Sequence, residues 1–397
     1  MTSIPGEIID LIIDEMGYSK DSASLEACST VCRHFLKRCR KHIFSNINLT
    51  SGRLYQRFRV LLFRNPEITA YITEIHIVNP AIDSDVDFAT LCTSSFPIIL
   101  GMLSRLRNIT LQLDPEVLDW HTMPSATQIA LQDLFQRPSL ISICLRNLEH
   151  VPNNILSRCI QMKHLELSSV GFKPLSHEIK SWDTTFHQME SLALSNQTPT
   201  TAAPLIHAMT QSSTSLRRLS VLTCESQNLQ FGFYLMKALS NSIESIDWGA
   251  AEESELPQDI IGLESLPRLQ HISFLVTYES LDPLGIIREL LDRVTVDINI
   301  QYITLKVEFS TVLDLVNDEG NAWKGLDAIL SRDELSSIQR IVLTVSDTIR
   351  ERLNAHQPDE MDRSISLLLQ NLLPAARARG VVFIDLREEF SLIPNRK

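Results

Sequence analysis

Five sulfur- and nitrogen-bearing side chains lie close together near the beginning of the chain, and their types are those of zinc ligands. They are Cys28, Cys32, His34, Cys39 and His42. Structural zinc sites usually take ligands in pairs from short loops, whereas these residues fall within apolar helical patterns. A free cysteine on a helix behaves as a small hydrophobic side chain. We therefore expect buried helix cysteines here and no metal site.

Other residues with catalytic potential occur without the partners that a reaction needs. Residues 320–325 resemble a phosphate-binding loop, but Leu326 and Asp327 follow where lysine and a hydroxyl residue are required. Glycine contributes only 12 of 397 residues, about 3% against a usual value of roughly 7%, which disfavours cofactor-binding turns. A cluster of acidic residues could suggest a metal site or a general acid, but it has no positioned partner, so we interpret it as a solvated loop. Its members are Glu252, Glu253, Glu255 and Asp259. We expect a protein that is not an enzyme and holds no cofactor.

The first fifty residues carry the pattern of three short helices. Apolar residues recur at helical spacing from Ile4 to Met16, after a proline at the first turn. Ser22 or Ser24 is expected to cap a second helix, and a third covers residues 34–44. Three helices of this length form only a small core. The first helix carries more apolar side chains than that core can bury, so some of them are available to contact a partner.

This segment resembles an F-box of the kind found in large fungal families of F-box proteins. The resemblance covers about residues 3–49 and rests on the stretches Ile4-Pro5-x-Glu7-Ile8, Leu25-x-x-Cys28-x-x-Val31-Cys32-Arg33-x-Phe35 and His42-Ile43-Phe44. It implies docking on a Skp-type adaptor, and through it on a cullin, in a ubiquitin ligase. By position, the implied contact set is Ile4, Pro5, Ile8, Ile12, Val31, Cys32 and Phe35.

Charge is distributed unevenly along the chain. Residues 27–66 contain nine lysines and arginines and no acidic residue, so the rest of the chain, with a net charge of −12 overall, carries −21. The basic segment suits the acidic adaptor that the resemblance implies. It lacks the interleaved aromatic residues that stack on bases, which disfavours nucleic acid as a partner.

Cysteine usage and hydropathy favour a reducing compartment inside the cell. The seven cysteines are thinly spread and odd in number, which is unlike a disulfide framework and favours a reducing environment. The start of the sequence lacks the positive region of a secretory signal, and no apolar run reaches the roughly 18 residues of a membrane span. We expect a cytoplasmic or nuclear protein without a membrane partner.

A short phrase, apolar-x-x-apolar-x-apolar, recurs ten times after residue 66. Successive middle residues are separated by 34, 34, 22, 27, 27, 27, 26, 31 and 38 positions, so the centre keeps a nearly constant step. The last two apolar residues alternate as on a strand with one buried face. A unit this small cannot close its own core, which predicts stacked units with parallel strands. The middle residues are Ile75, Ile109, Ile143, Leu165, Leu192, Leu219, Ile246, Ile272, Ile303 and Ile341.

The phrase and its period resemble divergent leucine-rich repeats. The polar residue expected three positions beyond the phrase occurs once, as Cys224, so an irregular array is expected. Residues 380–386 read as a last strand or cap. The predicted fold is therefore α/β: a three-helix F-box over residues 1–49, then an irregular right-handed solenoid of leucine-rich-repeat type over residues 50–397.

Strand register predicts which residues point away from the core. We expect three rows of small, polar and charged side chains on the concave face, a surface that suits a protein partner. The candidate target-binding residues on these rows are His164, Glu166, Arg218, Asp247, His271 and Tyr302. For any single one of them, a merely solvated strand position is the alternative.

The sequence thus predicts a substrate-recognition adaptor of a Skp/cullin/F-box ubiquitin ligase. The helices would recruit the ligase, the repeats would bind an unknown target protein, and catalysis would belong to the partners. The alternative is a repeat scaffold whose helices cap the array and recruit nothing.

Overall fold

The computed structural model describes residues 5–79, 95–113, 118–152, 155–156, 159–173, 186–197, 205, 209, 215–223, 226–250, 262–276, 284–296, 298–307, 321–345 and 371–385. The chain divides into two compact units, residues 1–188 and 189–397. Each unit is described by itself below. The predicted boundary after residue 49 lies inside the first unit, and it stays a prediction.

Three helices begin the first unit. They are α1 (Gly6–Tyr18), α2 (Ser22–Ser29) and α3 (Arg33–Ile43). Their shared core consists of Ile13, Leu25 and Cys39. The cap of α2 differs from the expectation: Asp21 accepts a hydrogen bond of 3.1 Å from the Ser24 amide, because its carboxylate is one residue ahead of the helix.

Polar contacts and a glycine hold α1 close to α3. Asp14 accepts hydrogen bonds from the Arg38 guanidinium, and one of its oxygens lies 2.6 Å from His42 Nε2. A Cβ atom at Gly17 would lie 2.2 Å from the His42 ring, so only glycine fits at this crossing without moving that ring. These contacts fix the orientation of the first helix.

The strands of the first unit are parallel. Their order is β1 (Asn46–Leu49), β2 (Glu74–Asn79), β3 (Asn108–Leu113), β5 (Ser142–Val151) and β6 (His164–Phe172), while β4 (Leu118–Asp119) pairs with the far end of β5. The middle residues of the repeated phrase are direct neighbours, from Ile75 through Ile109 and Ile143 to Leu165. β1, which was not predicted, extends this row with Ile47.

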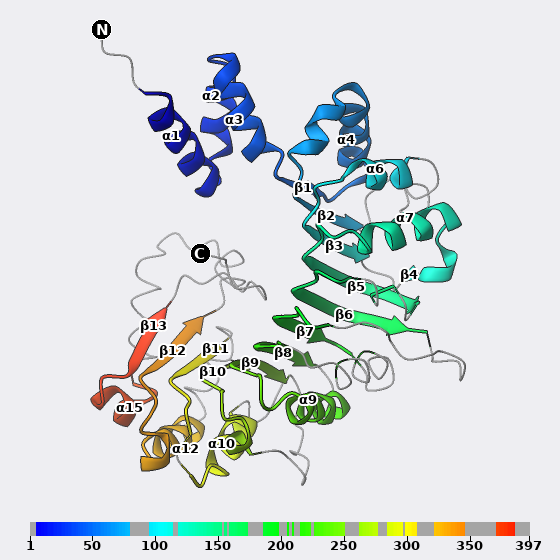
Figure 1. Cartoon of the computed structure of the whole chain (residues 1–397). Helices are drawn as coiled ribbons and strands as arrows, with labels where there is room; N and C mark the ends of the chain where they lie inside the picture. The colour runs from blue at the N-terminus through cyan, green and yellow to red at the C-terminus, as the bar shows by residue number, and fades with distance from the viewer. Residues whose placement is uncertain are drawn as a thin grey trace. The chain divides into compact units, whose positions relative to one another are not determined.

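Helices cover one side of these strands (Figure 1). The helix α4 (Gly52–Arg64) is capped by the Ser51 hydroxyl, which accepts from the Leu54 amide at 3.3 Å, and it buries Tyr55, Phe58 and Leu62. Shorter elements follow: η1 (Pro66–Ala70), α6 (Phe96–Met102), η2 (Trp120–Thr122) and α7 (Ser125–Phe135).

The second unit repeats this plan with seven parallel strands. They are β7 (Ser191–Ser195), β8 (Arg218–Thr223), β9 (Ser245–Ala250), β10 (His271–Val276), β11 (Tyr302–Val307), β12 (Arg340–Val345) and β13 (Val382–Asp385). The middle residues again align, from Leu192 to Ile341, and β13 is the expected last strand.

Helical connections run along one side of this sheet as well (Figure 1). They are α9 (Ser226–Ala238), η3 (Leu263–Ser265), α10 (Gly285–Asp292), α12 (Asn321–Leu330), η4 (Asp333–Leu335) and α15 (Pro374–Ala378).

The repeated phrase is confirmed at the level of packing. Every residue of the ten triplets is buried, including the leading member of each, which is at most 2% exposed. Before nine of the strands, β1 to β3, β5 and β7 to β11, one carbonyl in the turn accepts two amide hydrogens from the next turn. In the first unit, for example, Arg107 N and Asn108 N both donate to Thr73 O, at 2.7 and 3.0 Å. Each unit is thus a stack of parallel strands whose turns are joined by paired backbone hydrogen bonds.

Candidate interaction surfaces

An apolar stripe on α1 remains outside the three-helix core. Ile8, Leu11 and Ile12 are 46%, 65% and 52% exposed, and their spacing places them on one face of the helix. Ile9, Ile13 and Met16 occupy the other face and pack in the core. Ile8 and Ile12 belong to the predicted contact set, whereas Leu11 was missed, although it stands at the i+3 position from Ile8.

The rest of the predicted contact set lies mostly at the surface. Val31 is 66% exposed in the turn after α2, and Cys32 is exposed as the N-cap residue of α3. Pro5 is exposed ahead of α1, whereas Phe35 is half-buried against the helical core. Ile4 lies outside the described residues. The structure therefore brings most of this apolar set to the surface of the three helices.

The cysteines and histidines of this segment have separate surroundings. Cys39 is fully buried and Cys28 packs against it, as expected for helix cysteines, whereas Cys32 is exposed. Burial raises the pKa of the Cys39 thiol. His34 instead lies 3.2 Å from Asp10. Within the described part of the chain, no three His, Cys, Asp or Glu side chains are grouped so that they could hold a metal ion.

Two candidate target-binding residues lie on β6 in the first unit. Glu166 is only 6% exposed, and its Oε1 accepts hydrogen bonds from Arg146 at 2.6 and 3.1 Å. Arg146 also donates to Gln112 on β3, so three neighbouring strands are cross-linked on this face. Burial and the nearby Glu166 raise the pKa of Cys144 to about 12, which keeps this thiol protonated. His164 is half-buried at the start of β6.

The other four candidates lie in the second unit. Arg218, His271 and Tyr302 share one row, which continues to Arg340. Arg218 is exposed, Tyr302 is 40% exposed, and the His271 ring lies edge-on to it with centroids 6.4 Å apart.

Two further groups flank this row. Asp247 lies in the adjacent row, 3.9 Å from the Lys306 ammonium. Arg340 stacks over the Phe383 ring at 4.6 Å. Phe383 is exposed and was not predicted, because sequence alone did not align β13 with β12.

The row that contains Asp247 is mostly covered, contrary to the expectation of a solvated face. Ser220, Ser273 and Thr304 in this row are less than a tenth exposed, whereas Asp247 is partly exposed. A short side chain between longer ones in the flanking rows has little surface of its own. His271 illustrates this, since its Nε2 lies 3.0 Å from Thr304 Oγ1. The candidate surface is therefore narrower than predicted.

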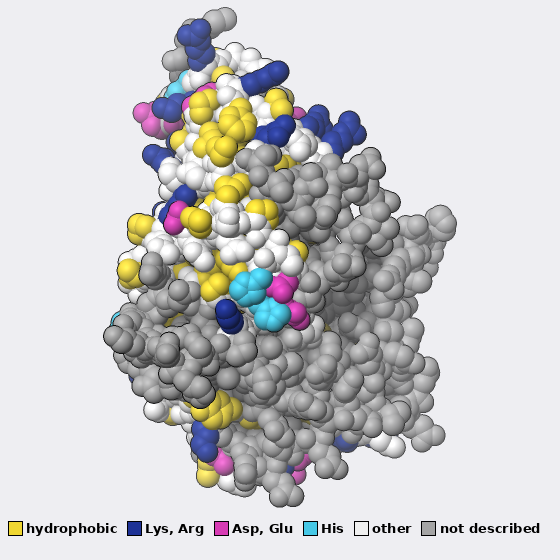
Figure 2. Space-filling view, turned by 90° about the vertical axis from the view of Figure 1, so that its right-hand side faces the viewer, with side chains coloured by type: hydrophobic (Ala, Val, Ile, Leu, Met, Phe, Trp, Pro, Cys, Tyr) yellow, Lys and Arg dark blue, Asp and Glu magenta, His cyan; other side chains and the backbone are white. Residues whose placement is uncertain are grey.

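A second apolar surface lies on the helical side of the first unit. Figure 2 shows hydrophobic side chains gathered there, above histidines that adjoin acidic side chains. Val60 and Phe63 of α4, Ile98 of α6 and Ile129 of α7 are between 44% and 57% exposed. The described helices include none that is long and apolar enough to span a membrane.

In comparisons with known proteins, no protein-family model and no curated protein matches the chain. Among solved structures, the chain is similar to an internalin from Listeria monocytogenes, with 14% sequence identity and a TM-score of 0.34. That similarity covers 75% of this chain and 84% of the internalin chain.

Proposed function

We propose that this chain is a substrate-recognition adaptor of a Skp/cullin/F-box ubiquitin ligase, in which the helices α1–α3 dock on a Skp-type adaptor and the repeats bind a target protein. The coarser role, a protein-interaction scaffold of leucine-rich-repeat type, rests on the parallel stacks themselves. The ligase role rests on the F-box resemblance and on the helical surface.

The observation that carries the proposal is the exposed stripe of Ile8, Leu11 and Ile12. The three-helix core is complete without these side chains, since Ile13, Leu25 and Cys39 fill it. Burying a large aliphatic side chain in an interface is worth about 1.5–3 kcal/mol. A stripe of this kind on a short helix is the form of anchor that helix-in-groove partners use.

Target binding is proposed for the second unit. Arg218, His271 and Tyr302 form a continuous row that offers cationic, aromatic and polar groups, and Arg340 and Phe383 extend it. Tyrosine and arginine dominate the binding energy of many protein interfaces. Glu166 is a weaker candidate, because a target would have to compete with its ion pair to Arg146.

The ligase role is tested by co-purification of the full chain with a Skp-type adaptor. We expect retention of the adaptor by the wild-type chain and roughly hundredfold weaker binding by the double variant Ile8→Asp, Ile12→Asp, which puts two charges into an apolar interface. The matched control is Ile98→Asp, Ile129→Asp, which changes equally exposed isoleucines on α6 and α7.

The control should bind the adaptor as the wild type does, and circular dichroism should show that all three proteins remain folded. Absence of the adaptor from the wild-type sample would reject the ligase role. Loss of binding in both variants would place the interface elsewhere.

One observation favours the alternative, a scaffold without ligase recruitment. The helices lead directly into β1, which pairs with β2, and Ser45 O accepts hydrogen bonds from both Thr73 N and Glu74 N. The helices are thus continuous with the first stack, as a terminal cap would be. A cap alone does not require the exposed α1 stripe, so the adaptor experiment separates the two roles.

A further inference from the structure

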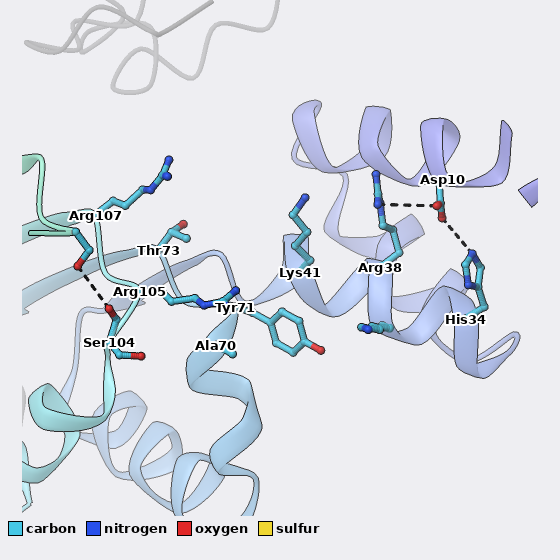
Figure 3. Close-up of a pocket in the computed structure, with 12 residues that line it drawn as sticks. Asp10, His34, Arg38, Lys41, Ala70, Tyr71, Thr73, Ser104, Arg105 and Arg107 are labelled. Carbon is cyan, nitrogen blue, oxygen red and sulfur yellow. Dashed lines mark hydrogen bonds and ion pairs between the residues drawn. The ribbon is translucent and has the colours of Figure 1, made fainter. Parts of the chain in front are cut away.

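A cleft of about 740 Å³ lies in the first unit between α3 and the turns that lead into β2, β3 and β5. Figure 3 shows Lys41 on one side, Arg105 and Arg107 on the other, and Thr73 and Tyr71 between them. Among the described lining residues most charged groups are cationic, namely Lys37, Arg38, Lys41, Arg105 and Arg107, and Asp10 is the single carboxylate.

The charges in this cleft are not balanced by the part of the chain that the structure describes. Asp10 is already engaged, since it lies 3.2 Å from His34 and 3.9 Å from Arg38. Arg38 is further paired with Asp14. Among the described residues, no ion pair is recorded for Lys37, Lys41, Arg105 or Arg107. Cations that face one space without counter-charges repel one another, and a ligand that carries negative charge relieves that repulsion.

The cations come in two pairs on two different elements. Lys37 and Lys41 are one helical turn apart on α3, and all four side chains of the two pairs are exposed. Arg105 and Arg107 stand two residues apart before β3. The turn before β3 is rigid, because Arg107 N donates to Thr73 O at 2.7 Å. A ligand that satisfies both pairs must carry several charges and bridge the two elements.

We propose that this cleft binds an acidic segment of a partner protein, in extended conformation. Successive side chains on one side of an extended chain are about 7 Å apart, so alternate Asp or Glu residues can reach separate cations. Arginine holds carboxylates with paired hydrogen bonds, and the Ser104 and Ser139 hydroxyls offer polar contacts to a peptide backbone. Nucleic acid fits less well, because Tyr71 and His34 are the only aromatic rings among the described lining residues and the chain carries a net charge of −12.

The cleft and the exposed stripe are separate sites, since Ile8, Leu11 and Ile12 do not line the cleft, so peptide binding and adaptor binding can be tested by different variants. The test uses the full chain and a fluorescein-labelled peptide in which aspartate and glutamate alternate with serine. Binding is followed by fluorescence anisotropy. We expect the acidic peptide to bind with an affinity that falls as salt is added, and the same peptide with asparagine and glutamine not to bind.

Two double variants test each side of the cleft. One double variant is Lys37→Gln, Lys41→Gln, and the other is Arg105→Gln, Arg107→Gln. Each should weaken peptide binding about tenfold or more, which corresponds to the loss of one charge-assisted hydrogen bond. Arg53→Gln, Arg57→Gln on α4 removes the same charge from exposed positions away from the cleft and should leave the affinity unchanged. Ile8→Asp should also leave it unchanged, whatever its effect on the adaptor.

Equal binding by the wild type and both cleft variants would overturn the proposal. So would equal losses in the cleft and α4 variants, which would indicate a non-specific response to net charge. Stronger competition by inorganic phosphate or by single-stranded RNA than by unlabelled acidic peptide would replace the peptide with a phosphate ligand.

Discussion

At the scale of single residues, Asp14 joins α1 to α3. Its hydrogen bond to Arg38, with a further contribution from His42, lowers its pKa from 3.8 to about 2 against the opposing effect of burial. A carboxyl group whose pKa is lower in the folded chain stabilises the fold above its unfolded pKa. That contribution is lost as the pH falls from about 4 to about 2.

We expect Asp14→Asn to lower the free energy of unfolding by about 1 kcal/mol at neutral pH, after allowance for the partial exposure of the carboxylate. Urea titrations of both proteins at decreasing pH should show the difference shrinking as the wild-type carboxylate becomes protonated. Glu15→Gln, an exposed carboxylate on the same helix, serves as the control. A difference that persists unchanged to pH 3 would show that the amide disturbs packing rather than removing a charge.

The residue-level features of α1 were predictable only in part. Helical spacing identified the apolar positions, but each of the pairs Ile8-Ile9 and Ile12-Ile13 contains one exposed residue and one that packs in the core. Sequence alone does not say which face α2 and α3 cover. The F-box resemblance placed Ile8 and Ile12 in a predicted contact set, and both side chains are exposed, whereas the partner of Asp14 depends on a helix more than twenty residues away.

At the scale of elements, Asp327 of α12 caps the short helix α15 in the second unit. Its two carboxylate oxygens accept hydrogen bonds from Ala375 N and Ala376 N at 2.8 and 2.9 Å, and its side chain is buried. An aspartate at a helix N-terminus satisfies amides that otherwise have no partner.

We expect Asp327→Ala to cost about 2 kcal/mol, since it removes the acceptors of the Ala375 and Ala376 amides, and Ala376 is buried. Asp327→Asn, which keeps one acceptor oxygen, should cost less. Hydrogen exchange of the α15 amides, measured by mass spectrometry, reports the local loss. Unchanged protection in the alanine variant would mean that the cap does not stabilise α15.

The strands were the most predictable elements, because each phrase encodes both a leading turn residue and a period of two. That pattern fixed the register of ten strands. β1 carries the same phrase, as Phe44-x-x-Ile47-x-Leu49, but it was missed because these residues were assigned to the end of the helical segment, whereas β4 has only two residues. The pattern could not reveal the paired amide contacts to one carbonyl per turn, since backbone groups leave no mark in the sequence.

At the scale of the whole molecule, these carbonyls explain how repeats stack without the polar side-chain ladder of regular leucine-rich repeats. In the second unit, Glu190 O, Arg217 O, Glu244 O, Gln270 O and Gln301 O each accept two amide hydrogens from the following turn. Each of these turns is therefore tied to the next by paired backbone hydrogen bonds, and serine hydroxyls add to some of them, as Ser215 Oγ does by donating to Met189 O at 3.2 Å. In such an array, stability is approximately a sum of repeat and nearest-neighbour contributions.

This nearest-neighbour coupling predicts where a core substitution acts in the second unit. Ile303 lies in β11 between β10 and β12 and is fully buried, so Ile303→Ala should cost about 2–5 kcal/mol and raise hydrogen exchange in all three strands. Ile384 lies in β13, which pairs with β12 and ends the strand order, so Ile384→Ala should affect those two strands only. Equal increases of exchange in every strand from β7 to β13, for both variants, would instead show that the second unit unfolds as one cooperative block.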